Sequence, residues 1–130
     1  GRIASQITAV PGSSRYFKGS VVSYANETKI NLLRVNPETL SQHGAVSEQT
    51  VREMAEGALA VLQVDCVMAV SGIMGPDGGT DEKPVGTVWI AVGGKGNIRT
   101  MRYHFRYDRA RNTEMTAIAA MNELRKWLVG

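Results

Sequence analysis

The sequence predicts an α/β protein, a three-layer α/β/α sandwich around a mixed, mostly parallel β-sheet with one antiparallel hairpin. Segments with helical spacing of apolar residues alternate along the chain with short runs of apolar and β-branched residues. A glycine-rich stretch at 93–97 joins two of these runs, as in a hairpin. Helices that alternate with strands cover both faces of a sheet, which gives the three layers.

Helical spacing is clearest from Ser47 to about Gln63. Ser47 is a good N-cap, because its hydroxyl can accept from a free backbone N–H. We also expect the tail of a helix that ends before Pro11, a helical turn capped by Asn26, and a last helix from about Thr113. The apolar positions of the helix from Ser47 to about Gln63 are Val51, Met54, Ala55, Ala58, Leu59 and Leu62. Those expected to face inward in the last helix are Ile118, Met121, Leu124 and Leu128.

Four segments are predicted as strands: Gly19–Tyr24, Cys66–Val70, Val85–Val92 and Asn97–Tyr107. The continuous apolar run Cys66–Val70 is typical of a central strand that is covered on both faces. The last segment alternates strictly, so its apolar set should face the core while the polar set faces solvent. That apolar set is Met101, Tyr103, Phe105 and Tyr107.

Length and composition predict one globular domain over residues 1–130. The chain has 43% hydrophobic residues and a net charge of +3, too small an excess to select nucleic acid as a partner. The single cysteine, Cys66, cannot form an internal disulfide. No stretch approaches the ~20 apolar residues that a membrane span needs. We therefore expect a soluble, cytoplasmic domain without a membrane partner.

Ser14, Tyr24 and Lys29 form the first candidate site. A hydroxyl, a phenol and an amine can together perform acyl transfer, because a lysine of lowered pKa can deprotonate a serine directly or through a tyrosine. Ser14 would face the other two only if its loop folds back. The pattern alone favours a plain turn, a tyrosine at the rim of a sheet and a solvated lysine.

A glycine-rich loop follows the predicted strand Cys66–Val70, where open α/β sheets place their ligands. Glycines allow close approach of the backbone and outward-pointing N–H groups that can hold an anion. The loop is not a Walker motif, and on pattern a ligand role and a merely flexible connection are equally favoured. The candidate substrate-binding residues in it are Ser71, Gly72, Gly75, Gly78 and Gly79.

The third candidate is a cationic series around the last predicted strand. A solvated strand face explains most of it, whereas Arg109 enters the last helix, where a guanidinium and free helix N–H groups could bind phosphate or carboxylate. Nucleic acid ranks last among the partners, because the interleaved aromatic residues should face the core. No metal site is expected, since His43 and His104 lack partners at ligand spacing. The series is Lys95, Arg99, Arg102, Arg106, Arg109 and Arg111.

Taken together, six ordered motifs resemble the CinA C-terminal domain family of competence/damage-inducible proteins. They are Val10-Pro-Gly-Ser-Ser14, Val22-Ser-Tyr-Ala-Asn26 with Lys29, His43-Gly-Ala-Val-Ser-Glu48, Met54-Ala-Glu-Gly57, Val70-Ser-Gly-Ile-Met-Gly-Pro76 and Lys83-Pro-Val-Gly-Thr-Val88. The resemblance implies a bacterial amidohydrolase of pyridine-nucleotide salvage, which converts nicotinamide mononucleotide to nicotinate mononucleotide and ammonia without metal or cofactor. It also implies that Ser14 is the nucleophile and that Lys29 activates it through Tyr24.

Two departures from the family pattern bear on these expectations. Ser71 and Met74 stand where the family usually has threonine and alanine, so we expect altered selectivity. The family's Glu-Ser-Cys-Thr-Gly-Gly motif and its strand are expected before Gly1, so that this chain lacks part of the domain. The open sheet position left in this way, together with an edge hairpin, predicts a homo-oligomer. The alternative function is a non-catalytic nucleotide-binding or regulatory module.

Overall fold

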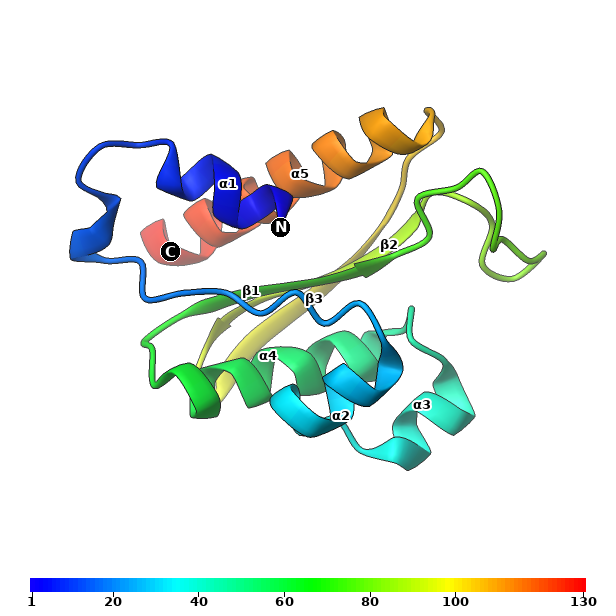
Figure 1. Cartoon of the computed structure of the whole chain (residues 1–130), viewed down its shortest axis with the longest axis horizontal. Helices are drawn as coiled ribbons and strands as arrows, with labels where there is room; N and C mark the ends of the chain where they lie inside the picture. Colours follow the sequence, from blue (N-terminus) through cyan, green and yellow to red (C-terminus); the bar gives the residue numbers. More distant parts are fainter.

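The computed structural model describes all residues 1–130, and its helices lie on both faces of a single sheet (Figure 1). In Figure 1, α1 and α5 lie on one side of the sheet and α2, α3 and α4 on the other. The α/β class is therefore confirmed. The helices are α1 Arg2–Thr8, the 3₁₀ helix η1 Ser13–Arg15, α2 Asn26–Leu33, α3 Pro37–His43, α4 Glu48–Leu62 and α5 Arg109–Val129, and the strands are β1 Val67–Gly72, β2 Thr87–Gly94 and β3 Asn97–His104.

The sheet is three-stranded and wholly antiparallel, so the expectation of a mostly parallel sheet is wrong for this chain. Its order is β1-β2-β3, and the register pairs Ala69 with Ala91 and Ile90 with Met101. The reason lies in the connection between β1 and β2. Residues 73–86 contain no helix, whereas a parallel pair needs a long crossover, usually helical. The hairpin between β2 and β3 is as predicted.

The segment Gly19–Tyr24 is extended but is not a strand of the sheet, which corrects the prediction. None of its backbone groups forms a hydrogen bond with another backbone group. Its side chains nevertheless alternate as in a strand. Val21 packs against the core on the α4 side, whereas Cγ2 of Val22 lies 4.0 Å from the position that a Cβ on Gly1 would occupy. β-branched residues favour an extended chain, but a strand also needs a neighbour, which this segment lacks.

Two clusters form the core. In the first cluster, Val51 and Ala55 of α4 pack against Ala91 of the sheet and against α2. Ile90, Val92 and Ala120 of α5 form the centre of the second. β2 is the most buried strand, and β1 is an edge strand, so the expectation that β1 lies centrally is wrong.

Of the predicted helix starts, that of α4 is confirmed and those of α2 and α5 need correction. The Ser47 hydroxyl accepts from the backbone N–H of Thr50 and caps α4 as expected. Asp108 caps α5 in the same way, which starts this helix before the predicted Thr113. Asn26 is not a cap, because it is already the first residue of α2 and follows the N-cap Ala25.

Several side chains expected in the core lie at the surface. Tyr107, Ile118 and Leu128 are exposed, because β3 ends at His104 and because α5 packs through its alanines instead. Tyr107 lies under the guanidinium of Arg111, with 5.6 Å between the guanidinium carbon and the ring centre. Cys66, expected to be buried, precedes β1 and is half-buried, and burial and Asp65 raise the pKa of its thiol. No helix is long and apolar enough to cross a membrane.

Candidate active site

Four parts of the chain meet at the carboxyl end of β1. They are the beginning of α2, the glycine-rich residues 73–86, the beginning of α5 and the end of the extended segment Gly19–Tyr24 (Figure 1). The hydroxyl of Ser71, near the end of β1, donates to the carbonyl oxygen of Ala45, 2.7 Å away, which ties β1 to the segment before α4. We call this end of the molecule the site end.

Lys29 is the most unusual residue of the site end. Its side chain is only 6% exposed, and its Nζ donates to the carbonyl oxygen of Ser23 at 2.9 Å. No carboxylate pairs with it, since the ion pairs of the structure are Arg111–Glu114 and Lys126–Glu123. Burial therefore lowers the pKa of Lys29. A buried amine of lowered pKa can accept a proton from a hydroxyl, as a general base must.

Tyr24 and Arg109 connect the extended segment to the loop. One guanidinium nitrogen of Arg109 donates to the carbonyl oxygen of Gly75 at 2.8 Å, and the other donates to the Tyr24 hydroxyl at 3.3 Å. A guanidinium has five N–H donors, so further donors of Arg109 remain for an anion. Tyr24 is 84% exposed, and its ring forms the outer rim of the site end.

The predicted glycines of the loop take different positions. Gly75 is buried with φ 92°, a left-handed conformation that favours glycine, and a Cβ on Gly72 would lie 2.6 Å from the Met74 methyl. Gly78 and Gly79 lie exposed at the outer turn of the loop. The backbone N–H groups of Gly75, Gly78 and Gly79 have no hydrogen-bond acceptor within the protein, and those of Gly78 and Gly79 belong to exposed residues, where an anion could bind.

Asn112 is a residue that the sequence analysis missed. It is fully buried on α5, and its side-chain amide donates to the carbonyl oxygens of Met74 and Tyr107, both at 3.0 Å. Its side-chain oxygen accepts from the N–H of Tyr107 at 3.1 Å. Asn112 thus holds the start of the glycine-rich loop and the approach to α5 in fixed positions. The only signal in the sequence is an asparagine, a poor helix former, in the first turn of a helix.

Ser14 lies away from the other candidates. It is exposed on η1, which precedes the extended segment, whereas Tyr24 and Lys29 follow that segment. Figure 1 shows η1 at one end of the molecule and the start of α2 at the other. The loop before the segment does not fold back toward Lys29. Within one chain the structure therefore brings together Tyr24, Lys29, Ser71, Gly75 and Arg109, but not Ser14.

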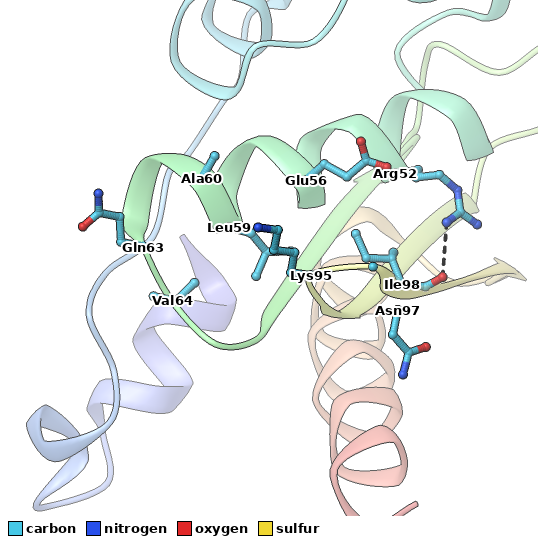
Figure 2. Close-up of a pocket in the computed structure, with 10 residues that line it drawn as sticks. Arg52, Glu56, Leu59, Ala60, Gln63, Val64, Lys95, Asn97 and Ile98 are labelled. Atoms are coloured by element: carbon cyan, nitrogen blue, oxygen red, sulfur yellow. Dashed lines mark hydrogen bonds between the residues drawn. The ribbon is translucent and has the colours of Figure 1, made fainter.

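A separate open pocket lies beside the carboxyl-terminal half of α4. It has a volume of about 790 Å³ and is lined by α4 together with the turn between β2 and β3 (Figure 2). Arg52 spans its wall by donating to the carbonyl oxygen of Ile98 at 3.2 Å. Lys95 is its only member of the predicted cationic series, and none of the candidate catalytic residues lines it. We therefore place the candidate active site at the site end.

The fold and the site end define an α/β domain with a buried lysine, a tyrosine and an arginine grouped beside a glycine-rich loop at one end of its sheet. The comparison with protein families is consistent with this class. The model of the CinA C-terminal domain matches residues 1–128, and the chain belongs to this family.

Relatives of the chain carry names from the same family. It is 46% identical over 129 residues to a CinA-like protein of Geobacter sp. (strain M21) and 48% identical over 131 residues to one of Shewanella amazonensis, matching 99% and 100% of this chain. It spans 31% of the length of each of these relatives.

Solved structures of the family have the same fold. The competence damage-inducible protein A of Klebsiella pneumoniae is 37% identical and superimposes with a TM-score of 0.95, covering 99% of this chain and 80% of its own. A competence/damage-inducible protein of Agrobacterium tumefaciens gives the same identity and TM-score, with 98% and 78% covered.

Proposed function

We propose that the chain is an amidohydrolase domain that hydrolyses the carboxamide of nicotinamide mononucleotide to nicotinate mononucleotide and ammonia. The observation that carries this proposal is Lys29, a buried amine without a carboxylate partner, whose pKa is lowered by burial. Its Nζ donates to the carbonyl oxygen of Ser23, the residue before Tyr24, and Arg109 contacts the Tyr24 hydroxyl. Membership of the CinA C-terminal domain family supports the same assignment.

In this proposal the chemistry is acyl transfer to a serine. Uncharged Lys29 takes the proton of the Ser14 hydroxyl, directly or through Tyr24, and the Ser14 oxygen attacks the carboxamide carbon. The carbon–nitrogen bond breaks, and Lys29 returns the proton to the departing ammonia. Water then hydrolyses the acyl-enzyme and regenerates Ser14. Burial lowers the pKa of Lys29, so at any given pH a larger fraction of this amine is uncharged and able to accept a proton than in an ordinary lysine.

The remaining residues of the site end would bind the substrate. Arg109 keeps donors beyond its two contacts and could hold the 5′-phosphate. The free N–H groups of Gly75, Gly78 and Gly79 could hold the phosphate or the developing oxyanion. Ser71 and Met74 lie where β1 leads into this loop, so they would influence which nucleotide fits.

A second candidate is a nucleotide-binding or regulatory module without catalysis. The separation of Ser14 from Lys29 within one chain favours it, because no hydrogen bond or loop of the structure brings the proposed nucleophile to its base. Such a module would keep the anion-binding groups around Arg109 and the loop. Binding of nicotinamide mononucleotide without ammonia release is its expected signature.

Ammonia release from nicotinamide mononucleotide separates the two candidates. We expect the wild-type chain to release ammonia and Lys29→Met to lose at least about 100-fold in rate, since general-base catalysis contributes roughly that much or more. Lys126→Met, at an exposed position of α5, is the matched control and should keep the wild-type rate. Nucleotide binding measured by calorimetry together with no ammonia above the blank would favour the non-catalytic module.

A further inference from the structure

Ser14 and Lys29 are too far apart in one chain to react together. Lys18, just after η1, donates to the carbonyl oxygen of Gln63 at 3.1 Å, which places η1 near the carboxyl end of α4. Ser71 at the site end donates to Ala45, which precedes the amino end of α4. Because α4 has 15 residues, its two ends lie about 20 Å apart at about 1.5 Å per residue.

Ser71, the other serine among the predicted site residues, cannot replace Ser14 without a rearrangement. The Ser71 hydroxyl already donates its proton to the carbonyl oxygen of Ala45 at 2.7 Å. Ser14, in contrast, forms no side-chain hydrogen bond and is exposed on η1. Its hydroxyl is therefore available to a group outside its own chain.

Large apolar or aromatic side chains are exposed both near Ser14 and along the segment that leads to Lys29. Val10 and Tyr16 are exposed beside Ser14, and Val22 and Tyr24 are exposed along the segment that leads to Lys29. A second copy that covered these side chains would remove their apolar surface from water, which favours association.

Each of the two surfaces carries one exposed charge without an ion-pair partner, and these two charges have opposite sign. Arg15 follows Ser14 and has no carboxylate partner, and Glu27, in the first turn of α2 with Lys29, has no cationic partner. Both side chains are exposed. A contact between the Ser14 surface of one copy and the site end of another would bring Arg15 and Glu27 toward each other, which favours this orientation.

We propose that the Ser14 loop of one copy of this chain completes the Lys29 site of a second copy. This inference rests on the proposed amidohydrolase function. The Ser14 proton passes to Lys29 of the other copy, the Ser14 oxygen bonds to the carboxamide carbon, and the carbon–nitrogen bond breaks as ammonia leaves with that proton. Water then hydrolyses the ester, and both copies return to their starting state. A two-fold arrangement gives two equivalent shared sites.

Mixing two inactive variants tests the proposal. Ser14→Ala and Lys29→Met carry different tags and are co-expressed, and the mixed oligomer is isolated through both tags. A mixed dimer has one intact shared site, so we expect about half of the wild-type ammonia release per dimer if the two-fold arrangement holds. The control variant is Ser20→Ala, at an exposed position of the extended segment, which should be fully active on its own.

The reciprocal mixture gives the opposite expectation. A dimer of wild type with the double variant Ser14→Ala/Lys29→Met has no intact shared site, so it should be inactive, whereas sites within one chain would leave half of the activity. Isolated mixed dimers of the two single variants without activity would overturn the proposal, as would full activity of a monomer or of Ser14→Ala alone. A wild-type protein that releases no ammonia would instead overturn the proposed function.

Discussion

The α4 side of the sheet and the site end are built in opposite ways. On the α4 side, Val51 and Ala55 are completely buried among other apolar side chains, and Gly57 lets α4 approach the backbone of α2. At the site end, the buried side chains are polar, namely Lys29 and Asn112, and they hold irregular backbone through hydrogen bonds.

This difference separates the source of stability from the source of function. Burial of apolar surface on the α4 side stabilises the fold directly. At the site end, burial removes the hydration of each polar group, and only new hydrogen bonds offset this cost in free energy. Lys29 has a single hydrogen bond to offset it. We therefore expect substitutions on the α4 side to lower stability, and substitutions at Lys29 to lower activity only.

The largest expected loss is on the α4 side, at Gly57. A Cβ at this position would lie 1.7 Å from the carbonyl oxygen of Leu33, so Gly57→Ala must push α2 and α4 apart. We expect it to lower the free energy of unfolding by about 3 kcal/mol in urea denaturation, although alanine is normally the better helix former. Ala60→Gly, exposed on the same helix, is the control and should lose only about 1 kcal/mol. A stabilised Gly57→Ala would contradict the close contact.

Asn112 tests whether the polar side chains of the site end also support the fold. Asn112→Ala leaves the carbonyl oxygen of Met74 and the N–H of Tyr107 without their partner. We expect a loss of about 2 kcal/mol, because unsatisfied buried groups carry their full desolvation cost. Asn122→Ala is the matched control on the same helix, where the side chain is exposed and its hydrogen bonds are with Arg125 alone. Equal unfolding midpoints for the two variants would show that Asn112 does not hold the loop.

Tyr103 and Glu123 are a polar pair within the apolar contact between β3 and α5. The Tyr103 hydroxyl donates to Glu123 at 2.6 Å, which lowers the pKa of Glu123, while burial and Glu123 raise the pKa of Tyr103 to about 12. We expect Tyr103→Phe to lose about 1 kcal/mol at neutral pH. Tyr107→Phe, at an exposed ring, should change nothing measurable.

The pair also predicts a dependence on pH. Because the pKa of Glu123 is lower in the folded protein than the ordinary 4.5, its contribution is present above pH 4.5 and disappears as the pH falls through the folded pKa. The difference in unfolding free energy between wild type and Tyr103→Phe should therefore shrink in acid. A difference that stays constant from pH 7 to pH 2, measured by urea denaturation, would contradict the bond to an ionised Glu123.

The smallest expected change in stability is at Lys29. Lys29→Met removes a buried amine along with its single hydrogen bond, so the two effects offset each other and we expect stability within about 0.5 kcal/mol of wild type at pH 7. In the wild-type protein, the free energy of unfolding should increase as the pH rises from the lowered pKa of folded Lys29 toward 10.5. In this range Lys29 binds the proton in the unfolded chain but not in the folded protein. Urea denaturation across this range should give a smaller rise for Lys29→Met.

Local signals in the sequence predicted local structure. Both the amino end of α4 and its apolar face follow from Ser47 and the spacing of the residues after it, which act within one helix. The direction of β1 relative to β2 and the pairing of Gly19–Tyr24 depend on other strands. The residue pattern of a single segment does not determine its contacts with distant parts of the chain. The predictions of a mostly parallel sheet and of a strand at Gly19–Tyr24 were therefore wrong.

The candidate site divides in the same way. Arg109 and the glycine-rich loop were predicted as site residues from their positions, one at the start of the last helix and the other directly after a strand. The structure brings both together with Tyr24. Asn112 was missed because its partners come from loop backbone, whose position no spacing of residues reveals. The distance of Ser14 from Lys29 depends on the course of the extended segment between them.

Titration of Lys29 itself tests the central claim most directly, namely that the site end holds an amine that can act as a base. The ¹³Cε signal of Lys29, assigned by its loss in Lys29→Met, reports the charge of the amine as the pH is raised. We expect Lys29 to lose its proton below the ordinary 10.5, because burial lowers its pKa. A midpoint at 10.5 or above would contradict the claim.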